Sequence, residues 1–163
     1  MLVSLIKLLP SITILKDAKD YLTRYFVFLK DRQFGNIFIH HFHRSDMDMG
    51  VDGFGLLHSH PFTWGVSFIL SGGYDEERMR PYKQNTKKTL FPQLYNCITC
   101  KRHLPFTFNF ISNKDFHRVD LLDEEKGAWS IFITGSRKNN TWGFWDRVTK
   151  EFIDWNSVVG AVE

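Results

Sequence analysis

Short runs rich in apolar residues recur along this chain, some of them alternating with polar residues, and turn-forming residues separate the runs. A period of two is typical of β-strands that bury one face. The pattern predicts strands over 36–42, 56–60, 64–70, 106–110, 116–122 and 129–134, with a last hairpin over 142–145 and 152–155. The polar stretch 74–82 fits an edge strand. Roughly eight or nine short strands with little helix predict an all-β sandwich or closed barrel.

Two segments leave their structure open. Residues 17–29 carry apolar side chains at helical spacing, but 25–29 also fit a strand. The apolar N-terminal 15 residues are interrupted by Lys7 and Pro10, are too short to span a bilayer, and lack the basic leader of a signal peptide. We expect them to form a short helix or extension. Asp and Gly residues predict a loop over 44–55.

Composition favours one folded domain over 1–163, with its core at about 21–155, because 43% of the 163 residues are hydrophobic and 16% are aromatic. The net charge of +3 is scattered, so neither nucleic acid nor a membrane is an expected partner. Cys97 and Cys100 are poor material for a disulfide framework, which favours a cytoplasmic protein. With His103 they have the spacing of half a zinc site, but no second pair completes it. We expect a partly exposed loop there and leave the role of these cysteines open.

Three histidines carry the candidate chemistry. His58 and His60 stand two apart on a predicted strand, so they share a face, and His117 on another strand could complete a triangle. Three neutral imidazoles bind Fe(II), Zn, Ni, Mn or Cu, and leave further coordination positions open for a small molecule. The alternative is that these are polar residues on a barrel wall without a ligand.

Residues 53–72 resemble the first motif of the cupin superfamily, in which His-x-His is followed by Glu and then by Gly. His58, His60 and Gly72 match this motif, whereas Gly65 occupies the Glu position. His117 lies where the second cupin motif has its histidine. The Pro and Gly that usually precede that histidine are replaced in this chain by Ser112 and Lys114.

A wider pattern, with His-x-His-Pro at 58–61 and Trp-Gly-Phe-Trp at 142–145, resembles small uncharacterised cupins of bacteria and bacteriophages. The resemblance runs from about 21 to 155. It implies a single-domain double-stranded β-helix, also called a cupin or jelly-roll barrel. It also implies a metal site with His58, His60 and His117 as ligands.

Such a site suits a metal-dependent oxygenase or dioxygenase that acts on a small molecule, with Fe(II) the favoured metal and Zn, Ni or Mn the alternatives. Thiol dioxygenases of the cupin superfamily resemble this case, since they also lack the Glu. Gly65 would leave room for a substrate beside the metal. A non-oxidative isomerase or epimerase, and a non-catalytic module that binds a ligand or a protein, remain alternatives. A 2-oxoglutarate oxygenase ranks lower, because those enzymes generally use His-x-Asp/Glu.

Other side chains could complete the site. Glu76 is the candidate fourth ligand, and Tyr74 and Arg78 are the candidate catalytic residues. Alternation places Glu76 and Glu77 on opposite faces. Arg78 and Arg80 share a face and could hold a carboxylate or phosphate. Further candidate ligands are Asp46, which we expect to cap a turn, and Asp48.

His40, His41 and His43 form a second group. His41 and His43 share one strand face and His40 takes the other. We expect scattered surface histidines, with a place at the mouth of the site or beside the metal ligands as the alternative. The Phe-rich strands would also suit a homodimer that pairs through sheet edges.

Overall fold

The computed structural model describes residues 2–16, 19–28, 34–46, 56–83, 94–138, 142–155 and 157. One short helix, α1 (Leu2–Ile6), precedes a set of strands. The strands are β1 (Ser11–Lys16), β2 (Lys19–Phe26), β3 (Asn36–Phe42), β4 (Leu57–His58), β5 (Trp64–Ser71), β6 (Tyr74–Lys83), β7 (Leu94–His103), β8 (Phe108–Ser112), β9 (Phe116–Leu121), β10 (Ala128–Thr134), β11 (Gly143–Trp145) and β12 (Phe152–Asp154). The prediction of an all-β fold with a short N-terminal helix is confirmed.

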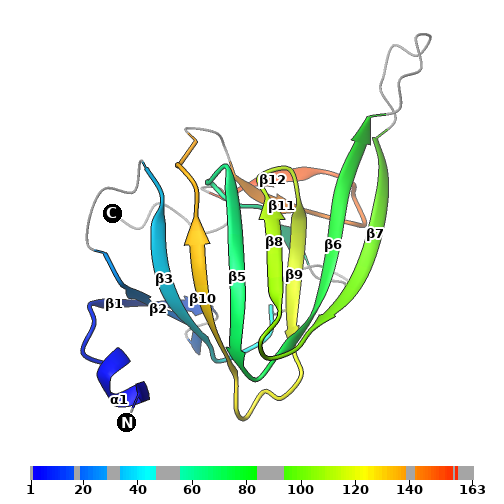
Figure 1. Ribbon diagram of the computed structural model, residues 1–163. Helices are drawn as coiled ribbons and strands as arrows, with labels where there is room; N and C mark the ends of the chain where they lie inside the picture. The colour runs from blue at the N-terminus through cyan, green and yellow to red at the C-terminus, as the bar shows by residue number, and fades with distance from the viewer. Residues whose placement is uncertain are drawn as a thin grey trace, which may run out of the picture.

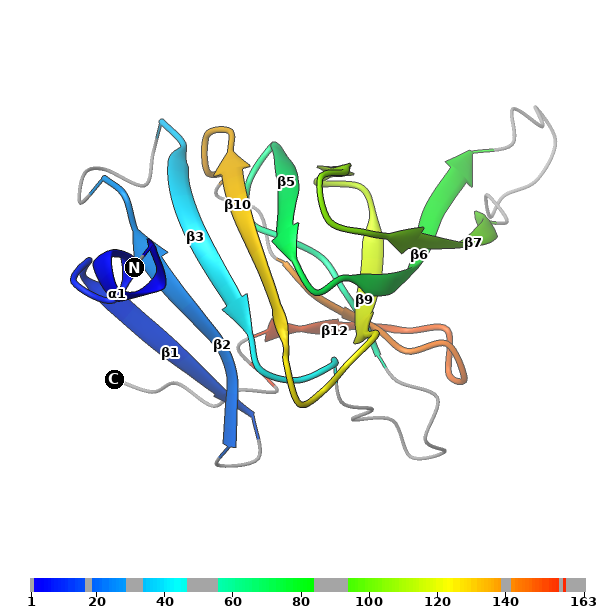
Figure 2. The ribbon, with the colours of Figure 1, turned by 60° about the horizontal axis from the view of Figure 1, so that its bottom comes forward.

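The strands form two six-stranded sheets that face each other as a jelly-roll barrel (Figures 1 and 2). The first sheet has the order β1-β2-β3-β10-β5-β8 and the second β12-β11-β4-β9-β6-β7. All of the pairings are antiparallel. Strands β8 and β7 are edge strands of the first and second sheet, and residues of both line one cleft together with β6.

The core lies between the two sheets, because alternate residues of β3, β5 and β10 are buried there. One cluster consists of Ile69, Tyr74, Val119 and Ala128, with Phe42 and Leu121 packed against it. A second cluster consists of Phe38, Ile111 and Phe132, with Phe26 and Phe62 beside it.

The turn from β5 to β6 depends on two glycines with positive φ, Gly72 at 73° and Gly73 at 142°. A Cβ on Gly72 would lie 2.2 Å from the carbonyl oxygen of Gly127, so no other residue fits there without movement. This turn carries the chain from the first sheet to the second. It thereby places Tyr74, the first residue of β6, in the interior.

The structure differs from the sequence prediction in three places. In the segment left open, 17–29, residues 19–26 form strand β2, and β1 was not predicted. Residues 94–103 form strand β7, so the predicted loop around Cys97 and Cys100 is wrong. Because β7 pairs with β6 along its whole length, β6 is not an edge strand. The polar sequence of β7 shows no strand pattern, because the strand is stabilised by its pairing with β6.

In the part of the chain that the structure describes, no helix combines the length and the apolar character that a membrane crossing requires.

Candidate metal centre

His58, His60 and His117 come together in the barrel. Strands β4 and β9 pair so that His58 lies directly opposite His117. His60 follows β4 closely, and its Nε2 lies 2.8 Å from Nε2 of His117. One nitrogen from each ring lies within 4.8 Å of the others, a spacing that could hold a metal ion. Of the described residues, these three alone form such a group.

His117 is held by a buried carboxylate. Its Nδ1 lies 2.6 Å from Oε1 of Glu76, and an ionised carboxylate can only accept a hydrogen bond. The imidazole proton of a neutral His117 must then be on Nδ1. The lone pair of Nε2 therefore faces His60. Metal-binding histidines that are oriented by a carboxylate have this arrangement.

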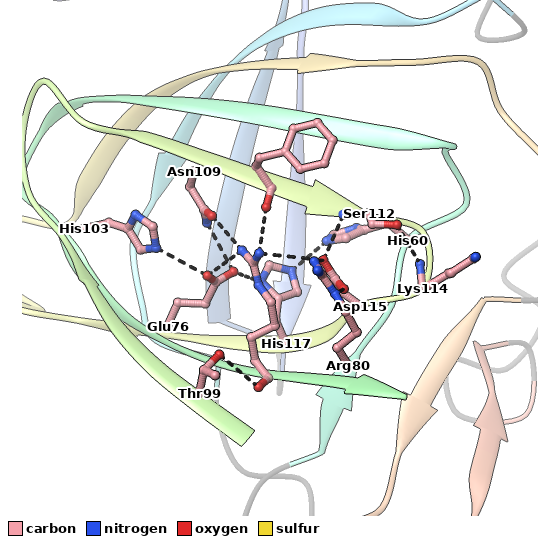
Figure 3. A network of polar contacts seen from close by, with 12 residues as sticks. His60, Glu76, Arg80, Thr99, His103, Asn109, Ser112, Lys114, Asp115 and His117 are labelled. Atoms are coloured by element: carbon pink, nitrogen blue, oxygen red, sulfur yellow. Dashed lines mark hydrogen bonds and ion pairs between the residues drawn. The ribbon is translucent and has the colours of Figure 1, made fainter. Parts of the chain in front are cut away.

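Glu76 is the centre of this polar network, in which four side chains donate hydrogen bonds to its two oxygens (Figure 3). Besides His117, Oε1 accepts from Asn109 Nδ2 at 3.1 Å, and Oε2 accepts from Arg78 Nη2 at 2.6 Å and His103 Nε2 at 3.3 Å. Burial alone would raise the pKa of the Glu76 carboxyl, but hydrogen bonds from His103, His117 and Arg78 hold it well below its usual range. Glu76 is therefore ionised inside the barrel.

Arg78 spans the space between the two sheets. Its Nη1 donates to the backbone oxygen of Phe110 at 2.7 Å, and its Nη2 also donates to Asn109 Oδ1 at 2.6 Å. Behind it, the fully buried Asp115 accepts two hydrogen bonds from Arg80, at 2.7 and 2.9 Å. The alternation of the sequence predicted that Arg78 and Arg80 share a face. Both arginines belong to this network, Arg78 through Glu76 and Arg80 through Asp115 (Figure 3 labels Arg80).

A second carboxylate lies beside His58. Asp46 Oδ2 is 3.5 Å from His58 Nδ1 and accepts the backbone N–H of Val119 at 2.7 Å. The hydroxyl of Tyr21 donates to its other oxygen. Asp46 is buried, and hydrogen bonds join it to Tyr21 and Val119, far from it in the chain. Asp46 therefore connects the chain that follows β3 to strand β9 and to His58. That it also caps a turn stays a prediction.

His60 lies in an apolar surrounding. Its ring stacks on Phe62 with centroids 4.6 Å apart and an interplanar angle of 17°. Burial, and then the neighbouring His58 and His117, lower its pKa well below 6.5. The ring is therefore neutral at physiological pH, as a metal ligand must be.

The space expected beside Gly65 is filled. A Cβ on Gly65 would lie 2.7 Å from Cζ of Phe132 and 3.0 Å from Cε2 of Phe62. Two aromatic rings therefore occupy the space that a side chain at position 65 would enter. The idea that Gly65 leaves room for a substrate is wrong, because the volume of the missing side chain is taken up by the core.

The histidines of β3 also differ from the expectation. His40 is 4% exposed and accepts a hydrogen bond on Nε2 from Arg24 Nε at 3.0 Å, so it is not a surface histidine. Burial, and then Arg24, lower its pKa well below 6.5. His41 and His43 share the other face as predicted, with the His41 ring stacked on Trp129.

The other predicted candidates lie apart from the histidines or outside the description. Tyr74 is buried, its hydroxyl accepts from Asn109 Nδ2 at 3.1 Å, and burial raises its pKa to about 12. Glu77 pairs with Arg147 and Arg118, away from Glu76. Asp48 lies outside the described residues. Cys100 is an exposed free cysteine.

A cleft of about 330 Å³ opens beside this network, between β6 and β7 on one side and β8 on the other. Its lining includes Glu76, Arg78 and Asn109, with Lys101 and Phe108 nearer the outside. Glu76 therefore separates this cleft from His117. A small molecule in the cleft would lie next to the carboxylate that orients His117.

Sequence reasoning missed Asn109 and Asp115, and it considered His103 only as part of half a zinc site with Cys97 and Cys100. Asn109 could have been found from the sequence, since it is a polar residue at an inward position of the Phe-rich run 106–110. Neither His103 nor Asp115 was expected at this site, because the first was assigned to a loop and the second to a turn. Only the pairing of β7 with β6 brings His103 to Glu76.

No protein-family model matches the chain, and the comparison with curated proteins found no match. Solved structures do match. The Fe(II) form of HppE is similar with a TM-score of 0.53 and 12% identity, over 78% of this chain and 57% of HppE. A cupin-2 domain protein from Rhodospirillum rubrum has a TM-score of 0.52 and 10% identity, over 80% of this chain and 72% of its own. The chain thus spans little more than half of HppE. At these identities the likeness concerns the fold, and the fold of this chain is that of the cupins.

Proposed function

We propose that His58, His60 and His117 bind one divalent transition metal and that the protein is a metal-dependent enzyme acting on a small molecule. The observation that carries the proposal is the Glu76–His117 contact, which turns the Nε2 lone pair of His117 toward the other two rings. Two imidazole nitrogens 2.8 Å apart in a buried site share at most one proton, and a cation between them satisfies both lone pairs.

The donor set guides the choice of metal and reaction. Three imidazoles without a carboxylate ligand suit Fe(II), with Zn, Ni or Mn as alternatives. Bound there, a metal supplies Lewis acidity and, if it is Fe(II), the capacity to react with dioxygen. We favour an Fe(II)-dependent oxygenase or dioxygenase. The Fe(II) form of HppE, which shares the fold, gives this choice its structural precedent.

The protein's own residues prepare the site. Glu76 keeps the proton of His117 on Nδ1, and Asp46 lies where it can do the same for His58. Phe62 and Phe132 exclude water on the side of Gly65. A neutral phenol at Tyr74 and the guanidinium of Arg78 hold Asn109 and Glu76 in place. Their catalytic role stays a prediction, as does direct ligation by Glu76, whose oxygens already accept four hydrogen bonds.

Metal binding tests this proposal. The purified protein, stripped with a chelator, is titrated anaerobically with Fe(II) and separately with Zn(II), Ni(II) and Mn(II) by calorimetry. We expect one metal per chain, and loss of binding in His58→Ala and His117→Ala. His41→Ala is the matched control, because His41 lies on the outer face of β3 against Trp129. A folded wild type with no affinity for any of these metals would falsify the proposal.

The reaction class needs its own measurement. Oxygen uptake by the Fe(II)-loaded protein is followed with a panel of small thiols, amino acids and hydroxy acids. Uptake that is coupled to loss of one compound supports the oxygenase. Turnover of a sugar with Zn(II) and without oxygen uptake would instead show an isomerase or epimerase. Retention of a small ligand after all three histidines are replaced would indicate a binding module.

A further inference from the structure

The outer face of the first sheet carries no charged side chain on four adjacent strands. Outward positions on β3, β10, β5 and β8 alternate with the buried ones, and none of them is Asp, Glu, Lys or Arg. An antiparallel sheet with one face in water normally carries polar residues on that face. On these four strands the outward face therefore lacks the charged residues that a water-facing sheet normally carries.

Strands β3, β10, β5 and β8 follow one another in the first sheet (Figure 1). Their register joins these outward positions into two rows that cross all four strands. The first row is Ile39, Ile131, Phe68 and Phe108. The second row is Ile37, Ile133, Val66 and Phe110. Neighbours in a row lie directly opposite each other on paired strands, so their side chains touch or nearly touch. We call the two rows together the outer apolar face.

The β8 end of the outer apolar face is well exposed. Phe108 is 67% exposed and Phe110 is 55% exposed. Next to them Phe106 is 76% exposed and has a φ of 66°, which is unfavourable for a residue with a side chain. Its backbone N–H donates to Ile69 O at 2.8 Å, which helps to hold that conformation. Three aromatic rings on this edge are therefore exposed to water. Burying them against an apolar surface would lower the free energy.

We infer that the outer apolar face packs against the same face of a second copy of this chain. Four strands about 4.8 Å apart, each with two or three outward side chains, present roughly 600 Å². Two copies would bury roughly 1,200 Å² in total, which reaches the size of specific interfaces. Two apolar sheet faces pack readily at about 10 Å, as the layers of a β-sandwich do.

The absence of charge favours a copy of this chain over a partner of another kind. A two-fold axis brings a patch against itself, so any charged residue near the axis would meet its like. The rows carry none. Pairing through the β8 edge is disfavoured, since Arg78 donates to Phe110 O at 2.7 Å and Asp115 accepts from Ser112 N at 3.0 Å. Face-to-face packing is therefore the arrangement that the sheet supports.

Sedimentation velocity of the full chain tests this inference at loading concentrations from roughly 1 to 100 µM. We expect a species with twice the mass of one 19.2 kDa chain. Phe108→Glu and, separately, Phe110→Glu place a charge in each row and should raise the dissociation constant at least tenfold, because two copies of the charge would meet. Ile98→Glu is the matched control, since Ile98 is 46% exposed on β7 of the other sheet, and it should remain dimeric.

Circular dichroism first shows which variants are folded. If one glutamate variant unfolds, the other still tests the face, and a monomeric wild type overturns the inference by itself. A wild type that stays monomeric at 100 µM overturns the inference, including the case in which another segment of the chain covers the face. So does a dimer of unchanged affinity in a folded Phe108→Glu or Phe110→Glu. A dimer that Ile98→Glu disrupts, while both Phe variants leave it intact, would place the interface on the other sheet.

Discussion

Nδ1 of His117 lies 2.6 Å from Oε1 of Glu76, and the two side chains are only 4% and 2% exposed. This contact joins β9 to β6 inside the barrel. It makes Glu76 a positioning residue for His117, in the way that carboxylates behind metal-binding histidines fix the tautomer and the direction of the ring.

Replacing Glu76 by Gln should weaken metal binding by roughly 10- to 100-fold, because the amide no longer favours the proton on His117 Nδ1 by its charge. Competition with a chelator of known affinity measures the change. Asp75→Asn is the matched control, since Asp75 is the adjacent carboxylate and pairs on the exposed side with Arg102. Equal affinities for Glu76→Gln and the wild type would contradict the positioning role.

Adding a methyl group at Gly65 should destabilise the fold by about 1–3 kcal/mol, because its Cβ would meet Phe132 Cζ at 2.7 Å. Chemical denaturation of Gly65→Ala measures the loss. In a double-mutant cycle with Phe132→Leu, the cost of the alanine should shrink, since the smaller side chain makes room. An alanine that is as stable as glycine would show that the aromatic rings do not fill this space.

Replacing Arg78 by Met should cost about 3–5 kcal/mol of unfolding free energy, because the buried Glu76 loses its cation and Asp115 loses a neighbouring one. The matched control is Arg102→Met. Arg102 forms a comparable two-bond pair with Asp75, but at the surface, where screening by water should leave stability unchanged. Similar losses in the two variants would refute the distinction between the buried network and the surface pair.

The metal-free protein should lose stability as the pH falls from 7 to 5. Burial and Arg24 hold the pKa of His40 below its value of 6.5 in a free chain, so the unfolded state binds more protons in this range. The sign is therefore a decrease in unfolding free energy with falling pH, by up to about 1.4 kcal/mol per pH unit for one such group.

Urea denaturation at pH 5, 6 and 7 measures this dependence. His40→Gln keeps an acceptor for Arg24 but does not titrate, so its stability should vary less with pH than that of the wild type. His60 and His41, whose pKa values are also lowered, leave part of the slope in place. The prediction fails if wild type and variant show the same slope.

Much of the fold could be predicted, because many strands are marked by apolar residues within a short stretch of sequence. The run 36–42 is rich in Ile and Phe, and β3 has those bounds. The final hairpin was also predicted correctly as β11 and β12. Strand β7 could not be predicted, since its polar residues show no buried face and its structure depends on pairing with β6. His40 was misjudged because a histidine has no local signal that separates a buried ring from a surface one.

The sequence by itself determined which side chains share a strand face. It put His58 and His60 on one side, separated Glu76 from Glu77, and left position 65 without a carboxylate. The tertiary structure decided which faces meet. Strand register set His58 opposite His117, the turn at Gly72 and Gly73 brought Glu76 to His117, and Phe132 filled the space over Gly65. The reason is that alternation is a property of a single strand, whereas register and packing depend on contacts between residues far apart in the chain.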